Sequence, residues 1–317
     1  MTSTCPRCGC STPGDTARFC ESCGAPVGQE EVHGDSLLGR VLGGRYQVVS
    51  KVGSGGMGRV YLAEDLLGGR EAALKVLNQT FASNNKIRTR FRMEAESLFN
   101  LSHPHIVEFL GYLEDEAGLP CLFMEFIRGR TVRQTIEDEG PMDTERLLDV
   151  SCQVLSGLHY LHTLPVPMVH RDVKPDNISF VGGQSVKLID FGIAKAPGKI
   201  GLTVAGSAVG TYEYMAPEQV EGSADLTPAC DQYSMGVTLY YMACGRVPFE
   251  QTTEAGYEVL SAHKSEEPPC PLRWAPNLPD FLRTGMLRAL AKSPEERFPS
   301  CFQFRRYLET AGAEGGA

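Results

Sequence analysis

The sequence lacks any run of about 18 consecutive apolar residues, the length that indicates a membrane-spanning helix. It also lacks a charged stretch followed by an apolar one at its start, where Met1-Thr-Ser-Thr leads straight into cysteines. Positive charge is scarce as well, because 30 lysine and arginine residues face 39 aspartate and glutamate residues, for a net charge of −9. The first two absences disfavour a membrane span in this chain and a secretory leader. The acidic net charge disfavours a nucleic-acid partner, because an acidic chain repels phosphate backbones.

Cysteine occurs at eleven positions but is concentrated at one end, with five cysteines in the first 23 residues. Spacing of the remaining six is irregular and their neighbours are mostly apolar, which is typical of buried thiols in a reducing compartment. We therefore expect a cytoplasmic protein without a disulfide framework. The six scattered cysteines are Cys121, Cys152, Cys230, Cys244, Cys270 and Cys301.

Composition divides the chain into pieces with different folding capacity. Residues 1–27 are rich in cysteine, glycine and proline and poor in large apolar residues, so they cannot build a core unaided. Residues 28–44, with several acidic residues and glycines, have the composition of a linker. A globular pattern extends over 45–310, which leaves 311–317 as a flexible tail.

Two Cys-x-x-Cys pairs lie in the first piece, Cys5/Cys8 and Cys20/Cys23, with 11 residues between them. Two tight turns of this kind present four thiolates tetrahedrally to Zn²⁺, and the segment resembles a zinc ribbon. Cys10 is a spare thiol that we do not expect to be a ligand, although it could compete with Cys8. Redox-active or unpaired thiols are the alternative interpretation of these cysteines. Because charge around these cysteines is nearly balanced, we expect a protein partner or dimerisation here instead of nucleic-acid binding.

Hydrophobic periodicity changes along the globular part. Strand-like patterns occupy 46–52, 59–63 and 72–77, a helical pattern covers 86–100, and two further strands fall within 105–127. After about Arg130 helical patterns dominate, for example over 144–162 and 230–244. A β-rich lobe followed by a helical lobe predicts an α+β fold.

One short stretch concentrates the residues of a phosphoryl-transfer site: His170-Arg-Asp172-Val-Lys174-Pro-Asp176-Asn177, followed by Asp190-Phe-Gly192. It supplies a carboxylate that can act as a base and two oxygen donors of the kind that Mg²⁺ prefers. Upstream, Gly53-Ser-Gly55-Gly-Met-Gly58 lies between two strand patterns. A glycine motif alone is weak evidence, but the strand after it argues against a dinucleotide-binding fold, in which a helix follows.

With these motifs, residues 46–310 resemble a eukaryotic-type Ser/Thr protein kinase domain of the bacterial kind, over more than four-fifths of the chain. The resemblance implies a two-lobed fold, with a β-rich N-lobe at 45–126 and a helical C-lobe at 127–310. It also implies an enzyme that uses ATP and Mg²⁺ to phosphorylate Ser or Thr hydroxyls of protein substrates. Relatives in this family often pair through their N-lobes for trans-autophosphorylation, so a homodimer is one expected assembly.

The nucleotide site is assigned by the same resemblance. The glycines of the motif approach the phosphates, Val60 and Ala73 form the roof over adenine, and Met124 is the gatekeeper. Backbone groups at the hinge hydrogen-bond adenine, and a serine takes the place of the usual apolar floor residue. The implied nucleotide-binding residues are Gly53, Gly55, Gly58, Val60, Ala73, Lys75, Met124, Glu125, Ile127 and Ser179.

Lys75 is expected to contact the α- and β-phosphates and to pair with a glutamate on the following helix. Glu94 matches the family register best, and Glu96 is the competitor. A lone Lys–Glu pair is more often a surface ion pair of little energetic value, so the assignment depends on the surrounding motifs.

Catalytic roles follow from the resemblance for four residues of the short stretch. Asp172 is the base that orients the substrate hydroxyl, and Lys174 steadies the transferring phosphate, as is typical of Ser/Thr-directed members. Asn177 and Asp190 are the Mg²⁺ ligands. Asp176, beside them, is a candidate for favouring a basic residue upstream of the target hydroxyl.

Two further assignments are structural. Glu218, in Ala-Pro-Glu218, is expected to form a buried ion pair with Arg297, and Asp231 is expected to anchor the catalytic loop from a central helix. Removal of one partner from such a pair typically costs about 3–5 kcal/mol.

A regulatory switch is predicted from three cations, Arg90, Arg171 and Lys195, which family geometry brings together. A phosphate on the activation segment would neutralise them and order the loop. Thr203 and Ser207 are the candidate autophosphorylation sites, and Thr211 is assigned to substrate docking instead. The alternative is that the three cations are solvated surface charges.

The leading hypothesis is therefore an active Ser/Thr protein kinase with an N-terminal zinc ribbon. A pseudokinase-like scaffold is the alternative from another class, but every catalytic position is filled. A small-molecule kinase of the same fold is disfavoured because the segment from residue 210 to residue 218 matches one that docks an extended peptide. A zinc-dependent nucleic-acid binder is disfavoured by charge.

Overall fold

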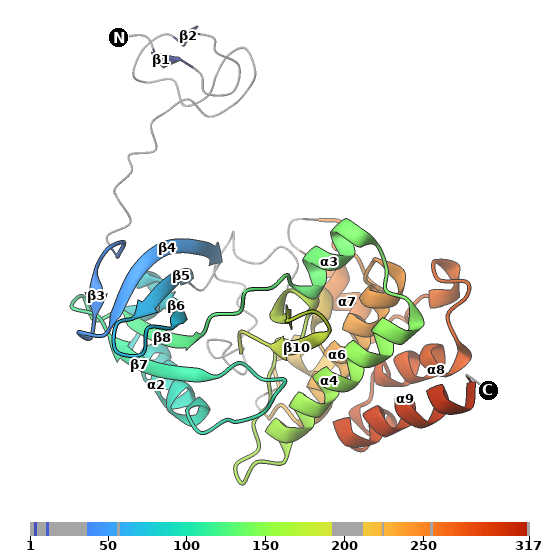
Figure 1. Ribbon diagram of the computed structural model, residues 1–317. Helices are drawn as coiled ribbons and strands as arrows, with labels where there is room; N and C mark the ends of the chain where they lie inside the picture. The colour runs from blue at the N-terminus through green and yellow to red at the C-terminus, as the bar shows by residue number, and fades with distance from the viewer. Residues whose placement is uncertain are drawn as a thin grey trace.

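Two regions of different secondary structure appear in the computed structural model (Figure 1). An antiparallel sheet with a helix against it, coloured blue to teal, forms the N-lobe, and helices coloured green to red dominate the C-lobe. Strands β1 (Ser3–Thr4) and β2 (Ser11–Thr12) pair with each other in a separate antiparallel pair. The structure describes residues 3–4, 11–12, 37–55, 58–191, 212–223, 225–253 and 256–315.

The N-lobe sheet has the strand order β3-β4-β5-β6-β8-β7, with each neighbouring pair antiparallel. Side chains alternate between its faces, so Tyr61, Leu74 and Val76 are buried in the lobe's core while Val60 and Ala73 on the other face are half-buried. The five predicted strands are confirmed, and β3 is a sixth strand that the sequence did not predict. Their bounds are β3 Val41–Leu42, β4 Tyr46–Gly55, β5 Gly58–Asp65, β6 Glu71–Leu77, β7 Phe109–Glu114 and β8 Pro120–Glu125.

The folded N-lobe starts earlier than residue 45, the boundary that composition predicts. Leu37 and Leu42 are buried in the same core as Tyr46 and Phe123. Strand β3 pairs Leu42 with Tyr46 across a tight turn. A two-residue strand is too short to produce a hydrophobic period, so residues 37–44 looked like linker although they belong to the lobe.

Helix α2 (Asn85–Leu98) follows the short α1 (Gln79–Ala82) and packs against β7 and β8. Phe91, Ala95 and Leu98 are buried on its inner side, as the helical pattern predicts. Phe99 falls just beyond the end of the helix and is exposed.

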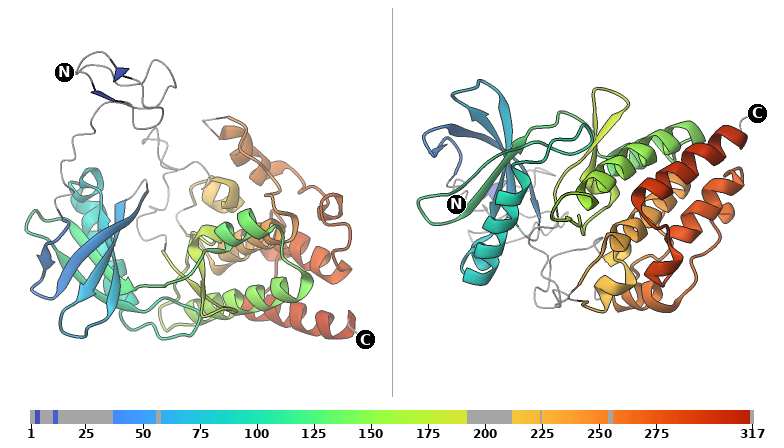
Figure 2. Two further views of the ribbon diagram at one scale, coloured as in Figure 1. Left: turned by 45° about the horizontal axis from the view of Figure 1, so that its top comes forward. Right: turned by 90° about the horizontal axis from the view of Figure 1, so that it is seen from below.

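Helix α6 (Pro228–Cys244) is the centre of the C-lobe, because every residue from Cys230 to Cys244 is buried. A helix that is buried all round is one enclosed by other elements. It packs against α4 (Thr144–His162) and α8 (Asp280–Ala289), and α9 (Cys301–Gly315) lies along α4 in both views of Figure 2. The remaining helices are α3 Val132–Glu139, α5 Pro217–Val220 and α7 Tyr257–Ser265.

Short elements connect these helices and carry much of the site. Strands β9 (Ile178–Val181) and β10 (Ser185–Leu188) form an antiparallel hairpin beside α4. Four 3₁₀ turns complete the described chain: η1 Pro175–Asn177, η2 Tyr212–Tyr214, η3 Pro271–Arg273 and η4 Pro294–Glu296.

An apolar cluster joins the two lobes. It contains Phe91 and Leu98 of α2, Phe109 of β7, Leu161 of α4 and Phe191. These side chains come from segments far apart in sequence, so the cluster fixes how the sheet sits on the helical lobe.

The six scattered cysteines are free thiols. Burial raises the pKa of Cys121 and Cys244 to about 12 and that of Cys152 to about 11, so these thiols stay protonated. Cys270 differs from the expectation of buried thiols, because it is exposed.

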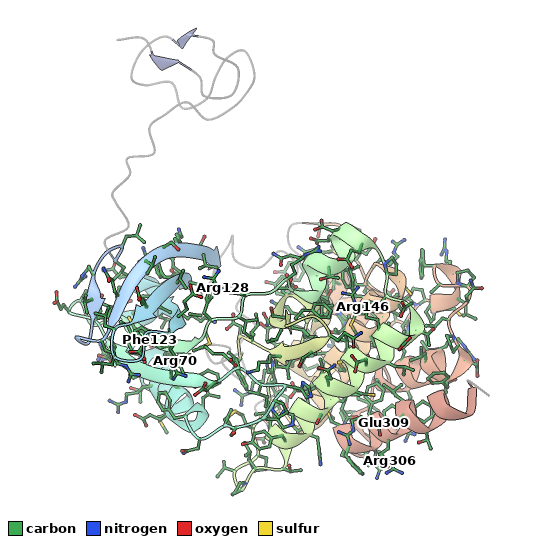
Figure 3. The ribbon with its side chains drawn as sticks, viewed as in Figure 1. Arg70, Phe123, Arg128, Arg146, Arg306 and Glu309 are labelled. Atoms are coloured by element: carbon green, nitrogen blue, oxygen red, sulfur yellow. The ribbon has the colours of Figure 1, made fainter. Side chains whose placement is uncertain are left out.

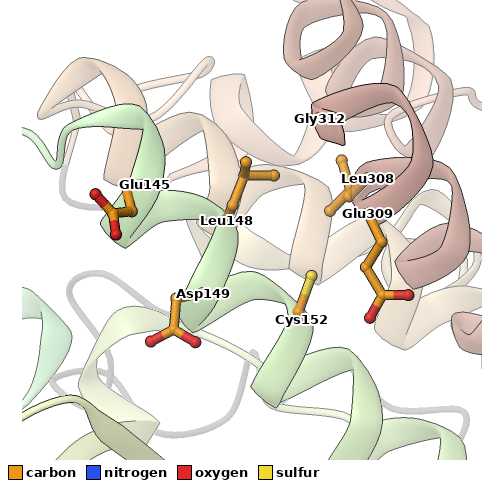
Figure 4. A pocket seen from close by; sticks show the side chains of 7 residues that line it. All are labelled: Glu145, Leu148, Asp149, Cys152, Leu308, Glu309 and Gly312. Carbon is orange, nitrogen blue, oxygen red and sulfur yellow. The ribbon is translucent and has the colours of Figure 1, made fainter. Parts of the chain in front are cut away.

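A groove of about 340 Å³ opens between α4 and α9 (Figure 4). Leu148, Cys152 and Leu308 line it, with Glu145 and Asp149 among the acidic residues. It contains none of the residues that the sequence assigns to a site. Across the described ranges, no helix combines the length and apolarity needed to cross a membrane.

Candidate active site

The catalytic loop is anchored by Asp231, a fully buried carboxylate in α6. Its two oxygens accept hydrogen bonds of 2.8 Å from the backbone N–H groups of His170 and Arg171. Nε2 of His162, in α4, lies 2.8 Å from Oδ2 of the same carboxylate. These bonds hold Arg171 at φ 66°, a left-handed conformation that non-glycine residues rarely adopt.

Burial by itself would raise the pKa of Asp231. The hydrogen bond with His162 and the nearby imidazoles outweigh this effect and lower the pKa below its ordinary value. The anchor is therefore a charged carboxylate whose hydrogen bonds compensate for its burial.

Asp172 lies between Lys174 and Asn177. Its Oδ2 atom is 3.4 Å from Nζ of Lys174 and accepts a 3.0 Å hydrogen bond from Nδ2 of Asn177. The same nitrogen is 2.8 Å from the backbone oxygen of Asp172 and 3.3 Å from that of Asp190. Because Nδ2 faces all three acceptors, Oδ1 of Asn177 points the other way, where it can act as a ligand atom.

Asp190 joins the two lobes at the site. It adopts φ 55°, and the N–H of the preceding Ile189 donates to the carbonyl of Asn177 at 2.8 Å. Its carboxylate forms an ion pair with Nζ of Lys75 from β6. The fold thus brings a lysine and an aspartate 115 positions apart into direct contact.

Phe191 fixes the backbone next to Asp190. Its ring centroid is 4.6 Å from that of His170 and 5.4 Å from that of Phe109. Since His170 belongs to the catalytic loop and Phe109 to the sheet, this packing holds both near Asp190.

Lys75 has a different described partner from the expected one. The structure pairs it with Asp190, while the side chain of Glu94 lies outside the described part, so the Lys75–Glu94 pair stays a prediction. Glu96, the competitor, is 60% exposed and forms a 3.6 Å ion pair with Arg92 on its own helix. That exposure turns Glu96 toward solvent and leaves Glu94 as the candidate.

The predicted roof residues share one face of the sheet with the lysine. Val60 pairs with Lys75 across β5 and β6, and Ala73 pairs with Met124 across β6 and β8. By strand alternation, the four side chains point to the face that packs on the interlobe cluster, where Met124 is 7% exposed.

Gly58 and Gly53 of the glycine motif differ in what a side chain at each position would contact. A Cβ atom on Gly58 would collide with the backbone carbonyl of Val76, so only glycine fits there. A Cβ on Gly53 would meet no atom within 4 Å, so no protein contact explains that glycine. Gly55 pairs with Gly58 at the end of the β4–β5 hairpin.

Ion pairs surround the hinge, residues 125–129, in which Figure 3 labels Arg128. Glu125 pairs with Lys187 of β10 and also accepts a 2.9 Å bond from the N–H of Glu108. Arg128 pairs with Glu71 of β6. The side chains of the hinge therefore bind protein groups on both lobes.

The backbone at the hinge is also partly committed. The N–H of Glu125 donates to the carbonyl of Glu108 at 2.9 Å. Ser179 is buried and its Oγ lies 3.5 Å from the carbonyl of Arg130. A Cβ on Gly129 would collide with the carbonyl of Phe180, so β9 and the hinge segment are in tight contact.

A protein-family model described as "Protein kinase domain" matches residues 46–301. The chain belongs to the protein kinase family. The Bacillus subtilis "Serine/threonine-protein kinase PrkC" is 34% identical over 275 residues, which cover 87% of this chain and 42% of that protein. The Corynebacterium glutamicum "Serine/threonine-protein kinases PknA" is 38% identical over 277 residues, 86% of this chain and 57% of that protein. The chain therefore spans about half the length of the curated relatives it matches.

A solved protein kinase structure is similar as well. The crystal structure of the Mycobacterium tuberculosis PknI kinase domain is 29% identical and superposes with a TM-score of 0.69, covering 86% of this chain and 98% of that one. The two-lobed protein kinase fold expected from the sequence is thereby confirmed.

A buried ion pair stabilises the C-lobe of this protein kinase fold. Arg297 donates bonds of 2.7 and 2.9 Å to the two carboxylate oxygens of Glu218. Its other N–H groups donate to the carbonyls of Ala229, Lys292 and Ala291 at 2.8, 3.0 and 2.9 Å. All five donors of the guanidinium are satisfied, which is what a fully buried arginine requires.

Several predicted residues lie outside the described ranges. The side chain of Arg90 is not described, and within the described ranges no group of three His, Cys, Asp or Glu side chains is placed to hold a metal ion. The other undescribed positions are Cys5, Cys8, Cys20, Cys23, Lys195, Thr203, Ser207 and Thr211.

Sequence reasoning missed three residues that organise the site. His162 binds the anchor Asp231, Lys187 binds Glu125 at the hinge, and Arg133 binds Asp176. His162 lies one helical turn after the buried Leu158, on the side of α4 that faces the core. A polar residue on an otherwise apolar helix face could have been recognised from the sequence. Lys187 and Arg133 are ordinary surface charges in sequence, and nothing local distinguishes them.

Proposed function

We propose that the chain is a protein serine/threonine kinase that transfers the γ-phosphoryl group of ATP to Ser or Thr hydroxyls. The carrying observation is that Lys75, Asp172, Asn177 and Asp190 converge from three segments into one hydrogen-bonded group. The names of the relatives support the Ser/Thr specificity, as does Lys174 beside the proposed base.

Asp172 acts as the base that orients the substrate hydroxyl and accepts its proton. Hydrogen bonding to Asn177 holds Oδ2, and Lys174 at 3.4 Å supplies positive charge where the phosphate transfers. The side chains of Asp172 and Lys174 are 14% and 16% exposed, so a hydroxyl can reach them while most bulk water is excluded.

The donor set fits Mg²⁺, because Oδ1 of Asn177 and the carboxylate of Asp190 are hard oxygen ligands. When bound there, the ion neutralises charge that develops on the phosphate oxygens. Lys75 holds the Asp190 carboxylate from the opposite lobe, so a nucleotide between the lobes would meet both groups.

ATP is proposed to lie beneath Val60 and Ala73, against Met124 and above Ser179. Glu125 has already used its N–H for Glu108, so its adenine contact falls to its carbonyl oxygen. We assign the N–H of Ile127 as the second hinge contact. Gly53, Gly55 and Gly58 cover the phosphates.

Activation is proposed to require phosphorylation of Thr203 or Ser207. The phosphate would pair with Arg171, Arg90 and Lys195 and would order the activation segment. Thr211 is assigned to peptide docking beside Asp172 and Lys174.

The N-terminal segment is proposed to bind Zn²⁺ through Cys5, Cys8, Cys20 and Cys23 and to serve as a protein-binding or dimerisation module. The free thiols of the lobes support a cytoplasmic location. A homodimer for trans-autophosphorylation belongs to the same proposal.

The test is the intact mass and phosphopeptide map of the protein after incubation with MgATP, with Asp172→Asn as the matched control. We expect phosphate on Thr203 or Ser207 in the unmodified protein and a loss of at least about 100-fold in the control. Native mass measurement of the same sample should show one Zn²⁺ that Cys5→Ser removes.

Bound ATP without phosphate transfer to the chain or to any protein would contradict the kinase proposal and favour a scaffold. Phosphate in Asp172→Asn at the same rate would remove Asp172 from its role. Phosphate on other residues alone would leave the kinase proposal intact but contradict the switch.

A further inference from the structure

Arg133 of α3 binds side chains from three other elements. Its Nε atom is 2.9 Å from both carboxylate oxygens of Asp176 in η1. Nη2 donates to the hydroxyl of Tyr214 in η2 at 3.1 Å, and Nη1 donates to that of Tyr241 in α6 at 3.4 Å. The guanidinium also lies 4.9 Å from the ring centroid of Tyr241.

The position of Asp176 makes this contact relevant to substrate choice. Asp176 lies between Lys174 and Asn177 in the catalytic loop, and its side chain is 42% exposed. An unpaired carboxylate at this place would attract a basic residue of a peptide that presents its hydroxyl to Asp172. Here the Nε–H group of Arg133 is shared between the two carboxylate oxygens, a charge-assisted contact from within the same chain.

Tyr214 is the second important contact. It is 3% exposed, and its backbone carbonyl accepts a 2.7 Å bond from the hydroxyl of Ser234 in α6. It lies in the segment from residue 210 to residue 218, which the sequence assigns to peptide docking. Arg133 therefore connects the loop that carries the proposed base to the segment that would hold the peptide.

We propose that Arg133 is a specificity-determining and positioning residue, which neutralises Asp176 and so prevents this carboxylate from selecting a basic residue in the substrate. The inference rests on the proposed kinase function and narrows its substrate class. It also replaces the expectation that Asp176 favours a basic upstream residue. Peptides are then selected by features other than a basic residue opposite Asp176.

The decisive assay uses peptides with a single Thr in an alanine–glycine background. One arginine is placed in turn at each of the four positions before the Thr, and kcat/KM is compared with that of the arginine-free parent. Arg133→Met keeps an unbranched side chain but removes the guanidinium and its charge. We expect it to raise the arginine preference at one position by about five-fold, the size of a partly exposed ion pair.

Two further variants make the result specific. Adding Asp176→Asn to Arg133→Met should abolish the new preference, because the carboxylate that creates it is gone. For Asp176→Asn alone, the ratio of kcat/KM for an arginine-containing peptide to kcat/KM for the parent peptide should stay within about two-fold of its value for the unmodified protein. The reason is that Arg133 already pairs with that carboxylate. The single variant keeps the test decisive even where Arg133→Met fails to fold.

Arg146→Met is the matched control. Arg146, labelled in Figure 3, also projects from a helix of the C-lobe, α4. It pairs with Glu139 at 2.9 Å, and its guanidinium lies 4.9 Å from the ring centroid of Phe180. Loss of its charge should not change the arginine preference, because its contacts are with Glu139 and Phe180 instead of Asp176.

Two results would overturn the inference. In one, Arg133→Met scales kcat/KM equally for all peptides, as a merely structural residue would. In the other, Asp176→Asn alone removes an existing arginine preference, which would show that Asp176 selects substrate despite Arg133. Self-phosphorylation by the unmodified protein is followed in parallel, and its absence together with absent peptide phosphorylation would count against the kinase proposal itself.

Discussion

One ion pair of the C-lobe and one ion pair of the N-lobe hold their charges in opposite ways. In the C-lobe, Arg297 and Glu218 are 0% and 15% exposed, and Asp231 is buried with its hydrogen bonds to the catalytic loop. In the N-lobe, Arg40 and Glu116 are 34% and 90% exposed. Buried pairs fail badly when one partner is lost, whereas exposed pairs exchange freely with water. The Arg297–Glu218 pair and Asp231 thus belong to a fixed base for the catalytic loop, whereas the Arg40–Glu116 pair can change at little cost.

The largest expected effect comes from breaking the buried side of this comparison. Arg297→Met leaves the Glu218 carboxylate without its arginine partner and removes one side-chain donor from each of three carbonyls. We expect the free energy of unfolding to fall by about 3–5 kcal/mol, measured by urea denaturation.

Arg297→Met combined with Glu218→Leu is the control, because removal of both charges avoids an unpaired buried carboxylate. The double variant should recover part of the loss. A cost below about 1 kcal/mol for Arg297→Met alone would show that the pair behaves like a surface contact.

The next effect concerns a buried histidine of the C-lobe. His263 is 0% exposed, and burial together with the charge of Lys292 lowers its pKa to about 3. An unfolded histidine titrates near its ordinary pKa, so below that value the unfolded state binds a proton that the folded state does not. Stability should therefore decrease by about 2 kcal/mol for this group between pH 7 and pH 5.

His263→Asn should remove this part of the pH dependence, and the measurement is the free energy of unfolding of both proteins at each pH. Other groups titrate equally in the two proteins, so the difference between their slopes isolates His263. Parallel slopes would mean that His263 protonates within the folded protein, which its complete burial argues against.

The smallest effect is expected on the exposed side of the comparison. Arg40→Ala removes the 2.8 Å pair with Glu116, and its cost should stay below about 1 kcal/mol. The cost should shrink further as salt is added, because the pair is solvent-exposed. A loss as large as that of Arg297→Met would show that the N-lobe surface is as tightly held as the C-lobe core.

Periodicity and motif spacing predict much of this molecule. The helical pattern over 144–162 is confirmed as α4, with Asp143 accepting from the N–H of Arg146 at its start. The strand patterns are confirmed because alternation survives wherever one face is buried. Asp172 and Asn177 converge because one short loop carries them, and the β9–β10 hairpin returns the chain so that Asp190 lies beside Asn177.

Long-range pairing is what the sequence does not reveal. No local pattern indicates that Lys75 contacts Asp190, or that Arg133 reaches Asp176. Both contacts depend on how lobes and helices pack, which is set by apolar shape. The sequence did not reveal the start of the N-lobe for a related reason. Leu37 and Leu42 are isolated buried residues that form no helical or strand-like hydrophobic pattern.

The packing of Phe191 has a mechanical consequence. Its ring lies in the cluster that contains Leu98 of α2, and the next residue toward the N-terminus is Asp190. Movement of α2 along the sheet would therefore displace the ring of Phe191, which directly follows Asp190, a candidate metal ligand. A partner that binds only the outer side of α2 and shifts this helix would therefore change the position of the Asp190 carboxylate without contacting it.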